Sequence, residues 1–249
     1  MTSKILLAFD FDHTVIDDNS DLYIKKLAPN GIPEAIEDTY SDQGWNEYMA
    51  AIFAHLHDLG VTEDELLSCV REIPFTDGMK ELLQYAKEKG HECIIVSDAN
   101  STFIQNIMSH YGLDDTMSAV YTNPAHFDKD GKLKIRYYHT QDWCDLSTVN
   151  LCKGHILEEH LKQRDKEGIQ YRAIFYIGDG SNDLCPSLRL KETDFVFARV
   201  NFRLWKKIRK LKEEEEKGVN KLVLKAKFVE WETGFDVIKV LQKLDEEST

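Results

Sequence analysis

Two aspartates separated by one residue lie near the start of this 249-residue chain. Asp10 and Asp12 follow the apolar run 5–9, which is rich in strand-forming side chains. In a strand, residues two apart point to the same face, so we expect both carboxylates to project together. Two close carboxylates repel each other unless a proton or a cation intervenes, which suits a metal site or a division of acid and base roles. A strand that ends in solvated aspartates is the alternative interpretation.

A second acidic segment, residues 178–183 with the sequence GDGSND, follows the apolar run 173–177. Its glycines allow a tight turn, and Asp179 and Asp183 offer the oxygen ligands that a hard cation such as Mg²⁺ prefers. The segment has neither the Gly-Lys-Ser/Thr ending of a Walker A loop nor the glycine spacing of a dinucleotide site. A calcium loop is disfavoured because its twelfth position is Leu190 rather than glutamate.

Three further polar residues stand where predicted helices or strands begin or end. Ser97 and Asp98 come directly after the run 92–96, where Ser97 or Asn100 is placed to cap the next helix. Lys153 precedes an amphipathic helix at 156–161. A cation at the N-terminus of a helix interacts unfavourably with the helix dipole, so we expect an anion close to Lys153. An exposed lysine is the alternative for Lys153.

Cysteines and histidines near Lys153 raise the possibility of a zinc site. His139, Cys144, Cys152 and His155 lie within one stretch, but only Cys152 and His155 have the close spacing of a half-site. We therefore expect ordinary thiols and a surface histidine there.

These positions require a parallel sheet to bring them together. Predicted strands lie at 5–9, 92–96, 117–122, 173–177, 195–198 and 227–231, with a small hairpin at 127–137. Helical patterns separate the strands, which indicates an α/β fold. Ligands in such folds bind beyond the carboxyl ends of the strands, where Asp10, Asp12, Ser97 and Asp179 are found.

Residues 22–74 read as an all-helical insertion. Trp45, Tyr48 and Ile52 belong to a stripe with helical spacing, and Thr62 with Glu65 matches a capping box. We expect the stripe to form a helical core, with a substrate-facing aromatic cage as the minority interpretation. The predicted division is a cap at 17–74 and a core domain at 1–16 and 75–249.

The composition narrows the class of protein. A formal net charge of −13 argues against the basic surface that nucleic acid or anionic lipid requires. No stretch approaches the about 20 apolar residues of a membrane span. The five scattered cysteines suit reduced thiols and a cytoplasmic location. A monomer and a homodimer both remain open.

The ordered motifs resemble the haloacid dehalogenase-type phosphohydrolases. The four matching positions are residues 10–14, Ser97, Lys153 and residues 178–183. The similarity is greater still to the phosphoethanolamine/phosphocholine phosphatase and pyridoxal phosphate phosphatase group. It is carried by the segments DDNSD at 17–21, SDAN at 97–100, TNP at 122–124, NLCK at 150–153 and GDGSND at 178–183.

The chain departs from this group in one place. Members often carry Cys-x-x-Cys-Pro before the Asn-Leu-Cys-Lys segment, whereas here Cys144 is followed by Asp, Leu, Ser147 and Thr. The function of the second cysteine and the proline is therefore absent or replaced.

The resemblance implies a Rossmann-like parallel sheet flanked by helices, with an inserted all-helical cap, and a specific division of labour. Asp10 would attack phosphorus and become an aspartyl-phosphate, and Asp12 would act as general acid and then base. Mg²⁺ would bind Asp10, the backbone carbonyl of Asp12 and Asp179, with Asp183 as a ligand or directly behind one. Ser97 and Lys153 would hold the phosphoryl oxygens.

The expected activity is thus Mg²⁺-dependent hydrolysis of a small phosphomonoester. Asp21 and Asp98 match substrate-binding acidic positions in the resembled group, which favours phosphoethanolamine or phosphocholine, with pyridoxal 5'-phosphate as the alternative. The competing interpretation is that these two aspartates only cap helices. A phosphoprotein phosphatase is disfavoured because the cap would leave no groove for a chain, and an inactive metal-binding scaffold is disfavoured because the motif residues are intact.

Overall fold

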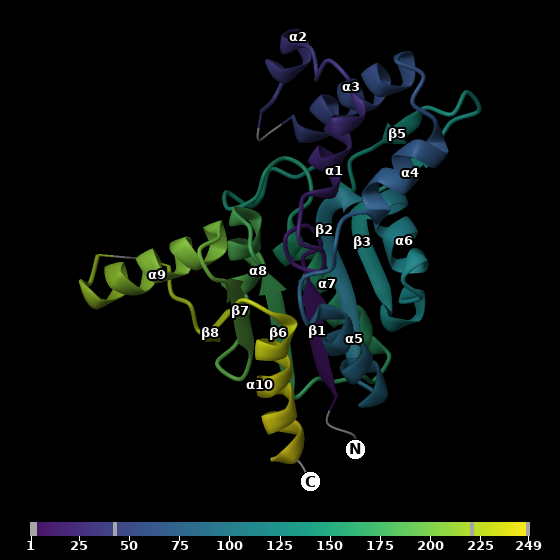
Figure 1. Cartoon of the computed structure of the whole chain (residues 1–249). Coiled ribbons are helices and arrows are strands. Elements are labelled where there is room, and N and C mark those ends of the chain that lie inside the picture. Colours follow the sequence, from purple (N-terminus) through teal and green to yellow (C-terminus); the bar gives the residue numbers. More distant parts are fainter. Residues whose placement is uncertain (1–3, 42–43, 220–221, 248–249) are drawn as a thin grey trace.

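The computed structural model describes residues 4–41, 44–219 and 222–247, and its centre is a six-stranded sheet (Figure 1). The strands are β1 (Ile5–Phe9), β2 (Glu92–Asn100), β3 (Ala119–Asn123), β6 (Ala173–Gly178), β7 (Phe195–Arg199) and β8 (Lys227–Trp231). Their order is β3-β2-β1-β6-β7-β8, and every neighbouring pair is parallel. The predicted α/β fold is confirmed. The order reverses at β1, so the ends of β1, β2 and β6 flank the point where such sheets bind ligands.

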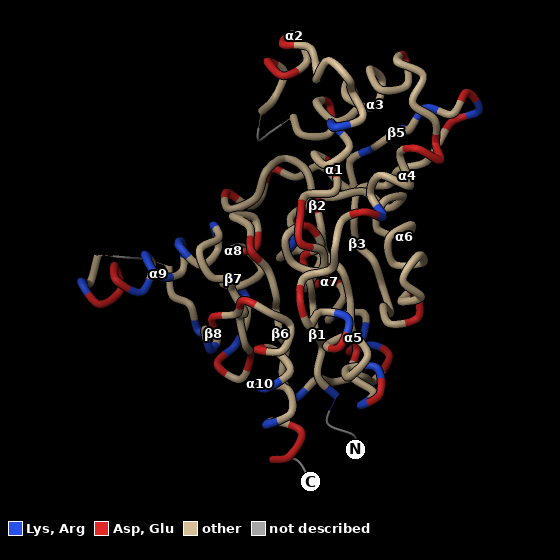
Figure 2. Tube along the Cα trace, viewed as in Figure 1, with Lys and Arg blue, Asp and Glu red and all other residues tan. Residues whose placement is uncertain are grey.

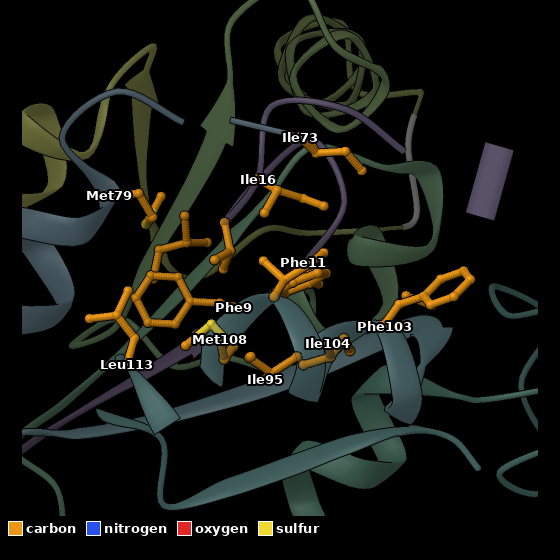
Figure 3. Close-up of a cluster of buried hydrophobic side chains, with 14 of the residues drawn as sticks. Phe9, Phe11, Ile16, Ile73, Met79, Ile95, Phe103, Ile104, Met108 and Leu113 are labelled. Atoms are coloured by element: carbon orange, nitrogen blue, oxygen red, sulfur yellow. The ribbon is translucent and has the colours of Figure 1, made fainter. Parts of the chain in front are cut away.

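Helices cover both faces of the sheet. The first face carries α5 (Met79–Glu88), α6 (Ser101–His110) and α10 (Gly234–Glu246), and the second carries α7 (Lys153–Lys166) and α9 (Arg203–Glu216). Alternate residues of β1 enter the two cores: Phe9 belongs to the first and Ala8 to the second. Figure 3 shows Phe9 and Phe11 among the side chains of the first core. Both phenylalanines therefore belong to the hydrophobic core on this face of the sheet.

Several element boundaries differ from the predictions, including β3 and the hairpin by about two residues, and two of the differences bear on the site. Strand β2 continues to Asn100 because it pairs with β3 again at Asn123, after a register irregularity between Val96 and Asn100. Helix α7 begins at Lys153 rather than at residue 156. Both differences occur at the expected site, where the backbone departs from a regular pattern. Short helices η2 (Asp114–Thr116), η3 (Ser181–Asp183) and α8 (Leu184–Ser187) were not predicted.

The segment between β1 and α5 is helical, as predicted. It contains α1 (Ser20–Tyr23), η1 (Ile24–Leu27), α2 (Glu34–Glu37), α3 (Trp45–Asp58) and α4 (Glu63–Arg71). Helices α1 to α3 lie beyond the carboxyl ends of the central strands (Figure 1). The α3 stripe is buried at Tyr48, Ile52 and Leu56, and the Thr62 capping box is present.

Helix α3 also contacts the predicted hairpin, which is formed by β4 (Ala125–Phe127) and β5 (Leu133–Ile135). The Tyr137 hydroxyl, just after the hairpin, donates to the Glu47 carboxylate of α3 at 2.6 and 2.7 Å. The helical segment is therefore held on two sides of the site, by its own connections to the sheet and by this hairpin.

Charged residues of both signs are spread over the chain (Figure 2). Basic residues lead and acidic residues follow along α9, while Lys and Arg elsewhere are dispersed over several elements. Within the described ranges, no helix combines the length and apolar character needed to cross a bilayer.

Candidate active site

A buried lysine joins the ends of β1 and β6. The Lys153 ammonium lies 2.8 Å from Asp10 Oδ2 and 2.8 Å from Asp183 Oδ1, and its side chain is fully buried. Burial opposes its charge, but Asp10 and Asp183 outweigh that effect and raise the pKa of Lys153 above its ordinary value. Two carboxylates, those of Asp10 and Asp183, thus supply the negative charge that was expected near this lysine at the start of a helix. The alternative of an exposed lysine is wrong.

Asp183 holds the GDGSND loop in its tight conformation. Its Oδ1 accepts hydrogen bonds from Lys153 and from the Tyr176 hydroxyl, at 2.8 and 2.7 Å. Its Oδ2 accepts the backbone N–H groups of Asp179 and Gly180, at 3.1 and 2.8 Å. Each oxygen already has two donors, so this carboxylate organises the loop rather than presenting a free oxygen.

The close approach of Asp183 explains a glycine. A Cβ added at Gly178 would lie 2.5 Å from Asp183 Oδ2. Only glycine leaves room for the carboxylate to fold back onto the strand end.

Asp10 and Asp179 form the open part of the acidic cluster. Carboxylate oxygens of Asp10, Asp179 and Asp183 lie within 4.8 Å of one another. Burial, followed by the charge of Asp183, raises the pKa of Asp179 to about 7. Burial likewise raises the pKa of Asp10 well above its usual range, although Lys153 acts in the opposite direction.

Asp12, two residues after Asp10, lies in a different environment. It is 9% exposed, and its Oδ1 accepts the Ser20 backbone N–H at 3.0 Å. Burial and then the nearby Asp21 raise the pKa of Asp12 well above the ordinary value. Asp12 therefore lacks the ammonium contact that Asp10 has with Lys153.

Asp21 is buried against α3 and β2. Its Oδ2 accepts the Trp45 indole N–H at 3.1 Å, and its Oδ1 accepts the Asn100 amide at 2.9 Å. Burial raises the pKa of Asp21 to about 6. The interpretation of Asp21 as a helix cap is wrong, because Asn19 caps α1 by accepting the Leu22 N–H.

Ser97 and Asp98 lie in the irregular part of β2. The fully buried Ser97 Oγ accepts the Ala99 N–H at 3.2 Å, which leaves its own hydroxyl proton to donate. Asp98 Oδ2 accepts the Asn182 amide at 2.8 Å, which ties β2 to the GDGSND loop. Neither residue caps α6; Asn100 does so by accepting the Phe103 N–H.

Buried asparagines from three segments complete the surroundings of the site. The Asn150 amide donates to Asn123 Oδ1 at 2.8 Å, and both lie near Asn46 Oδ1 of α3. Asn46 Nδ2 is buried without a hydrogen-bond partner in the part of the chain that the structure describes. The amides come from three distant segments, so local sequence patterns carry no signal that they meet.

The donor set of the acidic cluster fits a hard divalent cation. The cluster is buried, and its ligand atoms are all carboxylate oxygens. Burial raises the pKa of Asp10 and of Asp179, and the opposing effect of Lys153 is not large enough to cancel this rise. A cation among these oxygens would favour the ionised carboxylates.

Comparisons with known proteins agree with this geometry. Residues 5–245 match a family model described as "Putative Phosphatase". The chain is 39% identical over 244 residues to the rat protein "Pyridoxal phosphate phosphatase PHOSPHO2", covering 97% of this chain and 98% of that one. It is 34% identical over 244 residues to the human "Phosphoethanolamine/phosphocholine phosphatase", covering 97% of this chain and 89% of that protein.

A solved structure supports the fold. A substrate-bound phosphoserine phosphatase aligns with a TM-score of 0.60 at 18% identity, covering 96% of this chain and 99% of that chain. With the parallel sheet, the buried aspartates at its carboxyl edge and the full-length family match, the conclusion is that this chain belongs to the haloacid dehalogenase-type phosphatases, within the family of that model.

Proposed function

We propose that the protein hydrolyses a small phosphomonoester with Mg²⁺ and an aspartyl-phosphate intermediate. The observation that carries this proposal is Lys153, which lies buried at 2.8 Å from both Asp10 and Asp183 beside the open carboxylate of Asp179. This arrangement supplies a nucleophile, a cation for the phosphoryl oxygens and ligands for a metal ion within one small space.

Asp10 acts as the nucleophile. One of its carboxylate oxygens attacks phosphorus, and the bond from phosphorus to the ester oxygen breaks. Asp12 gives its proton to that oxygen, so the product leaves as an alcohol. The raised pKa of Asp12 supports this assignment because the group must begin the reaction protonated.

The second step regenerates the enzyme. Asp12, now ionised, takes a proton from a water molecule, whose oxygen attacks phosphorus. The bond between phosphorus and Asp10 breaks, inorganic phosphate leaves, and Asp12 is protonated again. Ser97 and Lys153 hold the phosphoryl oxygens during both steps.

Asp10, Asp179 and the backbone carbonyl of Asp12 would hold the metal ion. Asp183 stands directly behind them, since four donors already occupy its oxygens. The ion supplies positive charge that draws the substrate phosphate toward Asp10 and neutralises charge that develops in the transition state.

Residues 17–74 serve as the cap in this proposal. Helices α1 to α3 lie over the carboxyl ends of β1 and β2 (Figure 1). Asp21 of α1 accepts the Trp45 indole N–H of α3 and the Asn100 amide of β2. Closure of such a cap excludes water during attack by Asp10.

For the substrate we propose an amino alcohol phosphate, phosphoethanolamine or phosphocholine. Asp21 and Asp98 add negative charge beyond the phosphate-binding residues, which suits a substrate with a cationic end. The Trp45 ring, held by its bond to Asp21, is placed to add a cation–π contact. Tyr48, the other aromatic candidate, is occupied, since its hydroxyl donates to Glu37 and its ring faces Lys25.

Pyridoxal 5'-phosphate is the second candidate. Relatives that are 39% identical carry this compound in their names, and its ring nitrogen is a group that buried Asp21 could bind. None of the five cysteines is in a disulfide bond, which supports a cytoplasmic location of the protein with either substrate.

The substrate proposal is tested by comparing phosphoethanolamine, pyridoxal 5'-phosphate and a neutral aryl phosphate. Asp21→Asn and Asp98→Asn should each lower kcat/KM on phosphoethanolamine by about tenfold or more relative to the aryl phosphate. Asp38→Asn, which removes an exposed carboxylate of the same helical segment, should change neither. Equal losses on all three substrates would overturn the amino alcohol proposal, and a selective loss on pyridoxal 5'-phosphate would favour the second candidate.

A further inference from the structure

Three of the five cysteines meet behind the active site. Cys144 lies in the loop before α7, Cys152 directly precedes α7, and Cys185 belongs to α8. The Sγ atoms of Cys144 and Cys185 are 3.4 Å apart, and those of Cys152 and Cys185 are 3.7 Å apart. All three Sγ atoms lie within 4.8 Å of one another.

These separations resemble the edges of a tetrahedral zinc–thiolate site. A Zn–S distance of about 2.3 Å in a tetrahedron places neighbouring sulfurs about 3.8 Å apart. A disulfide needs a sulfur separation of about 2.0 Å and would use only two of the three thiols. The convergence of a third cysteine from another segment therefore favours a metal over a disulfide.

Ser147 adds a polar group to the cysteine cluster. It is the third residue after Cys144, and its hydroxyl lies beside both Cys152 and Cys185. The Oγ atom is buried, and within the described ranges its polar neighbours are these two thiols rather than an oxygen or nitrogen atom. A buried hydroxyl beside two thiols is in place for a fourth ligand or for a bond to a water molecule at that position.

The surroundings suit a negatively charged thiolate cluster. Arg189 Nη2 lies 3.8 Å from Cys152 Sγ and is itself paired with Glu158 at 2.5 Å. At Gly154 an added Cβ would lie 2.6 Å from Cys185 Sγ, so the glycine makes room for that sulfur. Cys144 is half-buried, which gives an ion access from solvent.

We propose that Cys144, Cys152 and Cys185 bind a thiophilic d¹⁰ cation, Zn²⁺, with Ser147 or water at the fourth position. Each cysteine loses its thiol proton to solvent on binding. His139 is not a ligand in this arrangement, because its Nε2 accepts the Cys152 backbone N–H at 2.9 Å. The zinc site is separate from the carboxylate cluster and does not rest on the proposed phosphatase mechanism.

The proposed zinc site lies next to active-site residues in the chain, so a bound metal would help to position them. Cys152 is bonded to Lys153 in the chain, and Cys185 follows Asp183 by two residues. A metal that joins these cysteines would fix the backbone of the lysine and of the carboxylate that pair at 2.8 Å. Cys152 and Cys185 are therefore positioning residues.

The experiment is a metal titration of the full chain, reduced and metal-free, with Mg²⁺ in excess to occupy the carboxylates. Competition with a chromophoric chelator should show one tightly bound Zn²⁺ per chain. Co²⁺ in its place should give the thiolate charge-transfer band and the visible bands of a tetrahedral ion. Cys144→Ala should weaken Zn²⁺ binding by more than about 100-fold, since even loss of a ligand's outer partner costs about 10- to 100-fold.

Two further variants make the test specific. Ser147→Cys should complete a four-thiolate site and tighten Zn²⁺ binding by about tenfold or more. Cys69→Ala removes a buried thiol outside the cluster and should leave the affinity unchanged. The proposal is overturned if Cys144→Ala binds Zn²⁺ like the wild type, if the Co²⁺ complex lacks the charge-transfer band, or if two cluster cysteines form a disulfide that Zn²⁺ does not prevent.

Discussion

Asp10, Asp12 and Asp21 are carboxylates that the fold buries at a cost to its own stability. Burial raises the pKa of each, which means that the folded protein holds their charge less easily than water would. Such groups are expected where function requires them, since activity often depends on locally unfavourable electrostatics. Their contributions to catalysis and to stability therefore have opposite signs.

The two aspartates of β1 should fail in different ways when changed to asparagine. Asp10→Asn should reduce turnover to less than about one hundredth of the wild-type rate, because it removes the nucleophile. It should still fold, since Lys153 keeps its 2.8 Å contact with Asp183. Asp12→Asn should also be inactive but should trap a phosphoryl group on Asp10, because the hydrolytic water lacks its base.

Mass spectrometry of acid-quenched protein, after incubation with substrate, checks this difference. The Asp12 variant should gain one phosphoryl group per chain and the Asp10 variant none. A phosphorylated Asp10 variant, or a rate above the stated limit, would contradict the role of Asp10.

Asp21 should make stability depend on pH in a definite direction. Its pKa in the folded protein, about 6, exceeds the ordinary aspartate value of 3.8, so the folded state binds the proton more tightly than the unfolded state. The associated stability is present below pH 3.8 and is lost as the pH rises through about 6. Asp21→Asn has no carboxyl group to titrate at this position and does not lose this stability. Its free energy of unfolding, relative to that of the wild type, should therefore rise by about 1 kcal/mol between pH 5 and pH 8.

Urea unfolding of metal-free protein at those two pH values measures the change. The exposed Asp38→Asn variant is the matched control and should show no such pH-dependent gain. An Asp21→Asn advantage that is larger at pH 5 than at pH 8 would have the wrong sign and would disprove the assignment.

At the scale of elements, the junction of β2 and α6 links stability with the proposed substrate-binding residue Asp21. Asn100 ends the irregular strand, caps α6 through its Oδ1, and donates from Nδ2 to Asp21 at 2.9 Å. Irregular backbone near an active site commonly redirects side chains, and here it allows one amide to serve two elements.

Asn100→Ala should therefore cost more than the loss of a helix cap. The cap accounts for about 1 kcal/mol, and the lost donor leaves buried Asp21 with only the Trp45 N–H. We expect a lower free energy of unfolding together with a higher KM for an amino alcohol phosphate. Thermal unfolding and steady-state kinetics measure the two effects.

Thr62→Ala is the control for this prediction, since Thr62 caps α4 with its side chain but does not contact Asp21. It should lose about 1 kcal/mol of stability and keep its KM. If both variants keep the wild-type KM, Asn100 serves α6 alone.

At the scale of the whole molecule, the protein has a net charge of −13, whereas the phosphate that its site is proposed to bind is also negative. The two charges repel each other. Lys153 is the one cation that contacts both Asp10 and Asp183 within the described ranges. The proposed divalent ion at Asp10 and Asp179 would resolve this conflict, because it would add positive charge where the phosphate must bind.

Activity should accordingly require Mg²⁺ and be inhibited by Ca²⁺. Mg²⁺ keeps a near-octahedral shell that leaves one Asp10 oxygen free, whereas the larger Ca²⁺ accepts both oxygens of a carboxylate. Mg²⁺ at about 100 times its Kd should also stabilise the fold by about 2.7 kcal/mol. Phosphate release and thermal unfolding after chelation, and after return of each ion, test this; full activity in the chelated protein would contradict it.

The strands of the sheet could be predicted from their short apolar runs alone. The runs at 5–9, 92–96 and 173–177 are each followed by polar groups, and parallel strands place their carboxyl ends on one edge. Knowledge of the strand type was therefore enough to predict that Asp10 and Asp179 meet, and their carboxylates do lie in one cluster. Local periodicity also predicted the α3 stripe and the Thr62 capping box, because both depend only on residues a few positions apart.

Contacts between distant segments could not be predicted from the spacing of residue types. Asp21 looked equally suited to capping a helix, and it is buried because Trp45 and Asn100 reach it from α3 and β2. The cysteine cluster depends on Cys185, which lies 33 residues after Cys152 and whose place beside it is set by the packing of α8 against α7. Such contacts follow from how whole elements pack, and the short-range spacing of residue types carries no information about them.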